Sequence, residues 1–204
     1  MLFTDTYLTI SQTSEGIFRD RASKFLGIAV PVTTEAEMKQ ALDVIRKKYF
    51  DATHHCYAFR LGADKTVFRS NDDGEPSGTA GRPILGQIQS KDLTNLLVVV
   101  VRYYGGTKLG VPGLINAYKT AAREALEANS IVEKTVQDIY EVFFKYDHMN
   151  DVMRVLKDEQ VTQLSHQFDT QCVIRFSVRQ QHAGRIADML GKLKEVKVNF
   201  VETV

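Results

Sequence analysis

The chain has 204 residues, of which 44% are hydrophobic and 25% charged, and its formal net charge is +1. This composition is typical of a globular protein, and the balanced charge excludes a polycation that binds nucleic acid through non-specific phosphate contacts alone. The apolar runs are too short to span a bilayer, and the first residues lack the pattern of a secretory signal, so we expect a cytoplasmic protein without membrane contact. Cys56 and Cys172 are expected to be reduced thiols.

The first third of the chain predicts β-strands followed by a helix. The candidate strands are 6–13, 16–20 and 25–30. Thr34 and Glu37 form a capping-box pattern, in which a hydroxyl and a carboxylate each satisfy a backbone N–H at the start of a helix. The helical spacing of apolar residues that follows predicts a helix over 34–49. Its last turn carries the basic residues 46–48, where the helix dipole favours cations.

The middle of the chain predicts a hairpin, a buried strand and two helices. Segments 57–61 and 66–69 flank a short glycine-containing turn and are expected to pair as a hairpin. The run 96–101 is apolar on both faces, which is typical of a central strand covered on both sides. The two helices are expected at 83–89 and 113–128.

The pattern changes near residue 131. Beyond this point six elements follow in the order strand, helix, strand, strand, helix, strand. This βαββαβ order is the ferredoxin-like pattern. We therefore predict an α+β protein of two domains, an α/β domain over 1–131 and a ferredoxin-like domain over 134–204, and we expect each domain to fold separately.

Two glycine-rich loops flank the apolar strand and predict one functional face. The first loop is 72–83, and the second is 102–113. Glycine lets the backbone approach a ligand closely, and loops that only connect elements are usually shorter.

The second loop has the residues of an anion site. Free N–H groups before a helix, together with a lysine, attract phosphate, and arginine adds planar two-point contacts. The spacing is not that of a P-loop, and the alternative is that the glycines only allow a tight crossover. The anion-binding residues predicted here are Arg82, Arg102, Gly105, Gly106, Thr107, Lys108 and Gly110.

The first loop and the segment before it hold further polar candidates. Carboxylates such as Asp72 next to hydroxyl residues can bind metal or carry out acid–base work, and they can equally cap turns. We leave the catalytic residues unassigned. The consecutive His54, His55 and Cys56 are too few for zinc, so we predict neither a metal nor a cofactor. The polar residues added to the predicted binding face are His54, Asp73, Glu75, Ser77 and Thr79.

Three segments, 52–60, 73–83 and 98–110, resemble the YigZ/IMPACT family, an uncharacterised family with an Impact N-terminal domain. The resemblance covers about residues 15–126 and extends by layout to the end, as in bacterial two-domain members. It implies that the first domain resembles a small-subunit ribosomal protein, elongation factor G and sugar-type kinases. The second would resemble the last domain of elongation factor G. Pro112 and Asn116 stand where the family commonly has glycine and a basic residue, which weakens the anion site.

The resemblance implies a binding role in translation or its regulation. Eukaryotic relatives are translational regulators that carry an additional N-terminal protein-binding domain, which we do not expect here. Two hypotheses follow. One is a binding protein that contacts RNA, the ribosome or a translation factor through the loop face. The other is a small phosphate- or nucleotide-binding enzyme using the same loops. We favour binding, because no set of acid, base and nucleophile is evident and the Gly-Ser-Ser loop of the kinases is absent.

Overall fold

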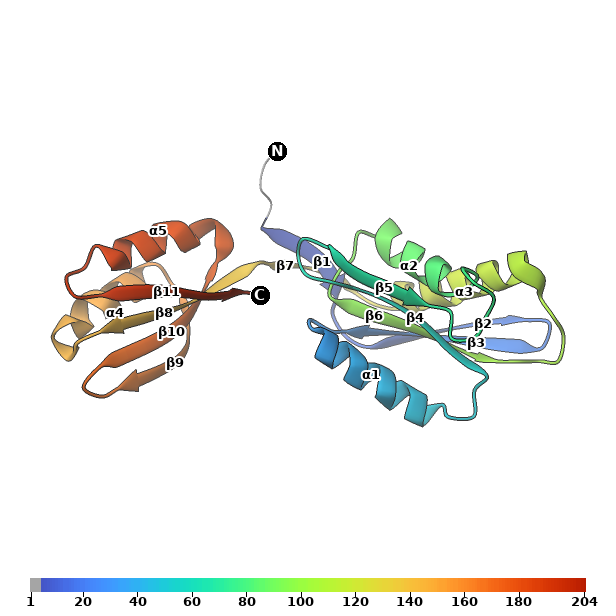
Figure 1. Cartoon of the computed structure of the whole chain (residues 1–204). Coiled ribbons are helices and arrows are strands. Elements are labelled where there is room, and N and C mark those ends of the chain that lie inside the picture. The colour runs from blue at the N-terminus through green and yellow to red at the C-terminus, as the bar shows by residue number, and fades with distance from the viewer. Residues whose placement is uncertain (1–4) are drawn as a thin grey trace. The chain divides into compact units, whose positions relative to one another are not determined.

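The structure is a computed structural model that describes residues 5–204 and divides them into two compact units (Figure 1). The first unit is Tyr7–Lys134, and the second unit is residues 5–6 together with 135–204. Each unit has its own hydrophobic core. The boundary near residue 134 lies close to the one predicted from sequence, but residues 5–6 belong to the second unit instead of the first. That the two units fold separately stays a prediction.

The first unit is built on a five-stranded antiparallel sheet in the order β2-β3-β6-β4-β5. The strands are β2 (Ser14–Asp20), β3 (Ser23–Pro31), β4 (His54–Leu61), β5 (Val67–Asn71) and β6 (Leu96–Tyr103). Three helices cover the sheet: α1 (Glu35–Lys48), α2 (Gly81–Ser90) and α3 (Gly110–Glu127). As predicted, α1 begins after Thr34, whose side-chain oxygen accepts a hydrogen bond from the Glu37 N–H.

The central strand β6 is buried on both sides, as its apolar sequence predicts. Leu97, Val99 and Val101 pack in the core beneath α1. Leu96, Val98 and Val100 pack in the core that contains α2 and α3, on the opposite face of the sheet (Figure 1). Since side chains alternate along a strand, the next even-numbered residue, Arg102, is directed toward the α2 and α3 side.

Helix α3 lies very close to the sheet because glycines face it. A Cβ atom at Gly27 would lie 2.2 Å from the Ala121 carbonyl oxygen, and one at Gly16 would lie 2.3 Å from the Ala125 nitrogen. The small side chains on this face of α3 complete the close contact. This packing fixes the position of α3, and α3 begins at the candidate functional site.

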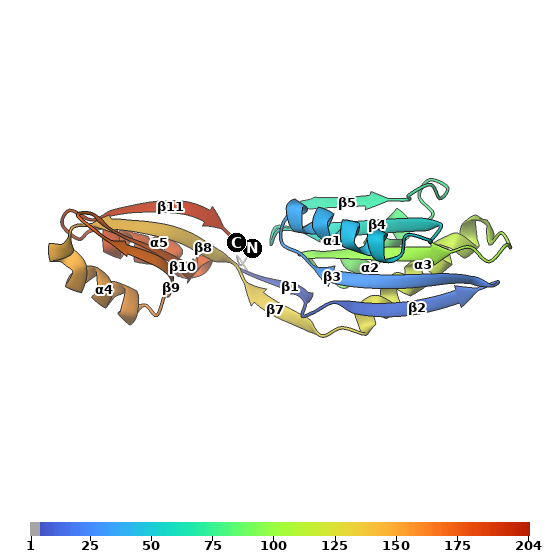
Figure 2. The ribbon, with the colours of Figure 1, turned by 90° about the horizontal axis from the view of Figure 1, so that it is seen from below.

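Strands β1 (Thr6–Ile10) and β7 (Ile131–Thr135) pair in a separate two-stranded sheet (Figure 2). The sequence predicted a strand at 6–13 but only a change of pattern near 131. Asn129, just before β7, donates from its side chain to the Gln12 carbonyl oxygen and to the Ser14 hydroxyl. The segment between the two predicted domains is therefore hydrogen-bonded structure and not an open linker.

The second unit has the predicted βαββαβ order. Its elements are β8 (Gln137–Phe144), α4 (Met149–Asp158), β9 (Thr162–Phe168), β10 (Cys172–Arg179), α5 (Gln180–Gly191) and β11 (Lys197–Thr203), with a 3-10 turn at Tyr146–His148. The strands form an antiparallel sheet in the order β11-β8-β10-β9, which is the ferredoxin-like order. Apolar residues of α4 and α5 pack on one face of this sheet.

Asp5 is a buried anchor within the second unit. Its carboxylate accepts two hydrogen bonds from Arg179, at 2.9 and 2.8 Å, and a third from the Gln181 N–H at 3.1 Å. The Val136 N–H donates to the Asp5 carbonyl oxygen at 2.7 Å. The hydrogen bond from Arg179 outweighs burial, so the pKa of Asp5 is lower than usual. A residue far away in sequence thus secures the start of α5.

Within the described part of the chain, residues 5–204, every helix is too short or too polar to cross a membrane.

Candidate functional site

The two glycine-rich loops and the start of β4 enclose a cavity of about 510 Å³ in the first unit, here called the loop cavity. It is lined by Thr53, His54, Glu75, Pro76, Arg102, Tyr104, Leu114 and the segment 108–111. The structure thus brings together five of the predicted binding residues: His54, Glu75, Arg102, Lys108 and Gly110. That they bind a ligand stays a prediction.

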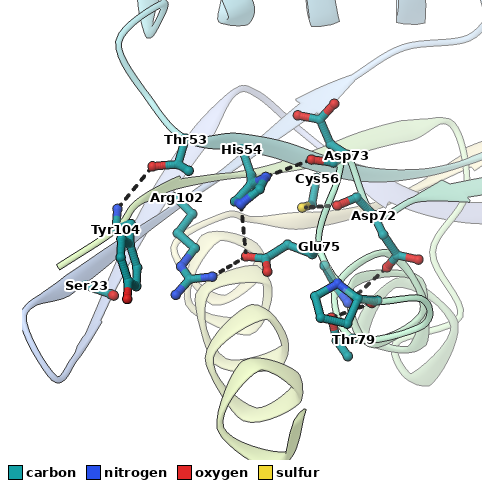
Figure 3. Close-up of polar contacts among 12 residues, drawn as sticks. Ser23, Thr53, His54, Cys56, Asp72, Asp73, Glu75, Thr79, Arg102 and Tyr104 are labelled. Carbon is teal, nitrogen blue, oxygen red and sulfur yellow. Dashed lines mark hydrogen bonds and ion pairs between the residues drawn. The ribbon is translucent and has the colours of Figure 1, made fainter. Parts of the chain in front are cut away.

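Arg102 forms the most constrained part of the cavity wall. The residue is only 5% exposed, and its guanidinium carbon lies 5.3 Å from the Phe25 ring centre and 5.2 Å from the Tyr104 ring centre. Its Nη1 donates to Glu75 Oε1 at 2.5 Å (Figure 3). Its Nε is buried and has no hydrogen-bond partner among the described residues. A buried donor on a charged group without a partner is unusual and calls for an explanation.

Glu75 neutralises Arg102 from the first loop. Its side chain is 4% exposed, and the same Oε1 also accepts a hydrogen bond from the Tyr118 hydroxyl at 2.7 Å. Tyr118 comes from α3 and is fully buried, with its ring edge-on to Phe25 at 5.1 Å. Burial raises the pKa of Tyr118, so the hydroxyl keeps its proton and remains a donor.

The contact of one His54 ring nitrogen fixes the tautomer of the neutral ring. Its Nδ1 lies 2.7 Å from the Asp73 carbonyl oxygen (Figure 3). A carbonyl oxygen only accepts, so Nδ1 carries the hydrogen. In the neutral ring Nε2 is therefore the acceptor, and it lies 3.8 Å from Glu75 Oε1. Asp73 lies outside the cavity lining and positions the histidine.

The Asp72 carboxylate holds the backbone of the first loop in place through hydrogen bonds. Its carboxylate accepts hydrogen bonds from the N–H groups of Gly78, Ala80 and Gly81, at 2.8, 3.0 and 2.8 Å. Burial acts to raise its pKa, but these three bonds outweigh burial and the pKa is lowered. The start of α2 is thus occupied by the protein's own carboxylate, as the capping alternative predicted.

The other predicted binding residues of the first loop lie away from the cavity lining. Thr79 is buried, and its hydroxyl donates to the Pro76 carbonyl oxygen at 2.7 Å. Ser77 and Arg82 are exposed and do not line the cavity. The predicted binding face therefore divides into residues that shape the loop and residues that reach the cavity.

The second loop also uses its glycines for shape. A Cβ atom at Gly105 would lie 2.2 Å from the Ala22 backbone, and Gly106 has a φ of +83°. The Gly105 N–H donates to the Ser23 hydroxyl, so it is not available to an anion. Gly105, Gly106 and Thr107 are absent from the cavity lining.

Lys108 is the exposed cation of the cavity wall. Its side-chain nitrogen forms no ion pair with the residues described here, 5–204, so its charge is uncompensated. The positively charged groups of the cavity wall are thus the side chains of Arg102 and Lys108, and not a row of backbone N–H groups.

Sequence reasoning missed the apolar part of the wall. Tyr104 is 46% exposed and Val111 is 53% exposed, and Leu109 and Leu114 lie beside them in the cavity. A tyrosine pair between a buried strand and a double glycine was the available signal, because exposed apolar patches often mark ligand-binding sites.

Cys56, next to the two histidines, is unsuited to nucleophilic chemistry. The Cys56 thiol is buried and donates to the Asp72 carbonyl oxygen at 3.0 Å, and burial raises its pKa. A protonated, buried thiol is a poor nucleophile. Cys56 and Cys172 are both free and belong to different units. Over residues 5–204, His, Cys, Asp and Glu side chains form no group of three or more that could hold a metal ion.

The fold and the cavity define a two-unit α+β protein whose first unit carries a cavity with arginine, lysine and aromatic walls. The chain belongs to the IMPACT family: residues 21–126 match the Impact N-terminal domain. This confirms the resemblance seen in the sequence, and the matched range includes the whole cavity lining.

The similar proteins agree with this assignment. IMPACT family member YvyE of Bacillus subtilis is 34% identical over 76% of this chain and 71% of its own length. YigZ of Escherichia coli is 33% identical over 67% of this chain and 68% of its own. The crystal structure of a hypothetical protein matches with a TM-score of 0.77 and 24% identity, covering 98% of this chain and 99% of that one. This last match shows a shared two-unit fold.

A further solved structure is that of Yih1, described as a two-domain translational regulator. It is 28% identical and covers 60% of this chain and 47% of that one, with a TM-score of 0.37.

Proposed function

We propose that this protein binds a component of the translation machinery through the loop cavity and regulates translation. The contact is to RNA, alone or within the ribosome or a translation-factor complex. Membership of the IMPACT family supports the translational part, since the family resemblance implies regulators of translation. The cytoplasmic location predicted from the sequence belongs to the same proposal.

The observation that carries the binding part is Arg102. Its guanidinium is buried, lies close to the rings of Phe25 and Tyr104, and has a donor without a partner among residues 5–204. Leaving a buried donor unpaired costs free energy, so a ligand oxygen that pairs with it gains more than it would at an exposed arginine. Lys108 at the same cavity adds an uncompensated positive charge. Phosphate oxygen fits both groups.

A phosphate- or nucleotide-binding enzyme is the second candidate. The favouring observation is that His54 and Glu75 face the same cavity, with the histidine held in one tautomer. A base beside an anion site is an arrangement used in catalysis. Turnover of a phosphorylated compound that is abolished in His54→Gln would favour this candidate over binding alone.

Replacing Lys108 with methionine tests the binding proposal. We expect the full chain to co-sediment with ribosomes at low salt. Affinity should fall about tenfold to a hundredfold in Lys108→Met, because a charge-assisted contact is lost while most of the apolar stem remains. The slope of log affinity against log salt should shrink by about one unit for one lost phosphate contact.

The matched control is Lys119→Met, which removes an exposed lysine of α3 outside the cavity lining. It should keep both the affinity and the salt slope of the parent. Equal losses in the two variants would show that only the overall charge matters, and the cavity proposal would be wrong.

A further inference from the structure

We propose that the loop cavity binds a single phosphorylated nucleoside unit, that is, one terminal phosphate with its ribose and base, and not a run of nucleic-acid backbone. This inference rests on the proposed function of the same cavity. It follows from the placement of donors, acceptors and apolar surface around the wall.

The donors fit one phosphate group. Arg102 uses Nη1 to bind Glu75, and no described residue accepts a hydrogen bond from its Nε. The Nε edge of a guanidinium can bind two oxygens of one phosphate side by side. Because Nε is buried, a ligand reaches this edge only after a local shift of the wall, and we expect the half-exposed Tyr104, whose ring centre lies 5.2 Å from the guanidinium carbon, to be the residue that moves.

The acceptors fit hydroxyl groups next to that phosphate. In the neutral His54 ring Nε2 is an acceptor, because Nδ1 donates to the Asp73 carbonyl oxygen. The two hydrogen bonds to the Glu75 carboxylate both use Oε1, and Oε2 accepts none from residues 5–204. Two acceptors cannot bind phosphate oxygen, but they can bind the hydroxyls of a ribose. A ligand with an anionic group alone would leave them unused.

The apolar wall fits a flat ring. Tyr104 and Val111 are exposed, and Leu109, Leu114 and Pro76 complete the surface. A nucleobase stacks on an aromatic side chain with a gain of roughly 1–3 kcal/mol per base. The cavity, at about 510 Å³, lies within the usual range for sites that enclose a small ligand.

The charge of the cavity limits the ligand to one phosphate. Arg102 is compensated by Glu75, which leaves Lys108 as the only uncompensated fixed charge among the lining residues. The whole chain carries a net charge of only +1. Proteins that follow a nucleic-acid backbone use a positively charged groove, whereas this cavity offers one cation and one buried guanidinium. An end group matches these charges better than a continuous strand.

Two sources carry this chemistry, a free nucleotide and the 5′-phosphorylated end of an RNA. Calorimetry on the full chain distinguishes them with AMP, 2′-deoxy-AMP, adenosine and inorganic phosphate, and with one RNA oligonucleotide bearing either a 5′-phosphate or a 5′-hydroxyl. We expect AMP to bind at least about tenfold more tightly than adenosine or phosphate, because each of these lacks one part of the contact. The 2′-deoxy compound should also be weaker.

The variants assign this binding to the cavity. Lys108→Met and Tyr104→Leu should each weaken AMP binding about tenfold or more, and Lys119→Met should leave it unchanged. Tight AMP binding without preference between the two oligonucleotides would identify the ligand of the cavity as a free nucleotide. Preference for the 5′-phosphorylated oligonucleotide would identify the ligand as the 5′ end of an RNA.

Equal binding of AMP and inorganic phosphate, or no binding of any of these compounds, would overturn the inference. The proposed function is tested separately, since ribosome co-sedimentation that depends on Lys108 can persist when no nucleotide binds. Loss of both would overturn both proposals.

Discussion

Replacing Glu75 with methionine is expected to destabilise the first unit by about 3 to 5 kcal/mol. The substitution keeps the length of the side chain but leaves Arg102 as a buried charge without its counter-ion, and removing one partner of a buried ion pair costs about this much. The Tyr118 hydroxyl also loses its acceptor. Urea-dependent hydrogen exchange at amides of β6 and α3 in the full chain measures the effect.

Glu15→Met is the matched control. Glu15 pairs with Lys48 on the surface, where both side chains are about half exposed, and solvent screening leaves such a pair little effect on stability. The double variant Glu75→Met, Arg102→Met should recover part of the stability, because two apolar groups can replace a buried ion pair. If Glu75→Met were no more destabilising than Glu15→Met, the buried pair would not support the cavity.

Asp5→Asn is expected to destabilise the second unit by about 1.5 to 3 kcal/mol, the usual contribution of hydrogen bonds to charged groups. The effect should lie toward the lower end because the Arg179 side chain is 39% exposed and solvent screens it. Hydrogen exchange at β10 and α5 should then be about tenfold or more faster, with the first unit unchanged. Glu202→Gln, at the exposed pair with Arg175, is the control and should have little effect.

The contact between Asp5 and Arg179 also predicts that the second unit loses part of its stability in acid. The folded-state pKa of Asp5 is below its ordinary value of 3.8. The stabilisation is therefore complete at neutral pH and is lost as pH falls below 3.8 through the lowered pKa. Acid unfolding of the second unit should lack this step in Asp5→Asn. An acid profile identical to that of the parent would show that Asp5 does not anchor the unit.

The elements that were predictable are those encoded by local patterns. The helix after Thr34 and the fully apolar strand at 96–101 depend on neighbouring residues, and both are confirmed. Strand β7 was missed because its five residues pair with β1, more than a hundred residues earlier, and only that pairing makes them a strand. The anchoring of Asp5 by Arg179 is equally non-local.

The candidate site shows the same division. The loops could be recognised from their glycine content, but the hydrogen-bond acceptor of each backbone N–H in them could not. The Gly105 N–H is taken by Ser23, and those at the start of α2 are taken by Asp72. The burial of Arg102 could have been inferred from its alternation with Val98 and Val100 along β6. Its pairing with Glu75, across 27 positions of sequence, required the fold.

The central claim is that the loop cavity binds a phosphate-bearing ligand. The most direct measurement is the change of backbone amide NMR shifts in the full chain as a 5′-phosphorylated RNA oligonucleotide is added. We predict that the largest changes fall at Thr53, His54, Glu75 and residues 102–111, with Lys108→Met removing them. Changes concentrated at the basic end of α1, residues 46–48, or in the second unit would contradict the account.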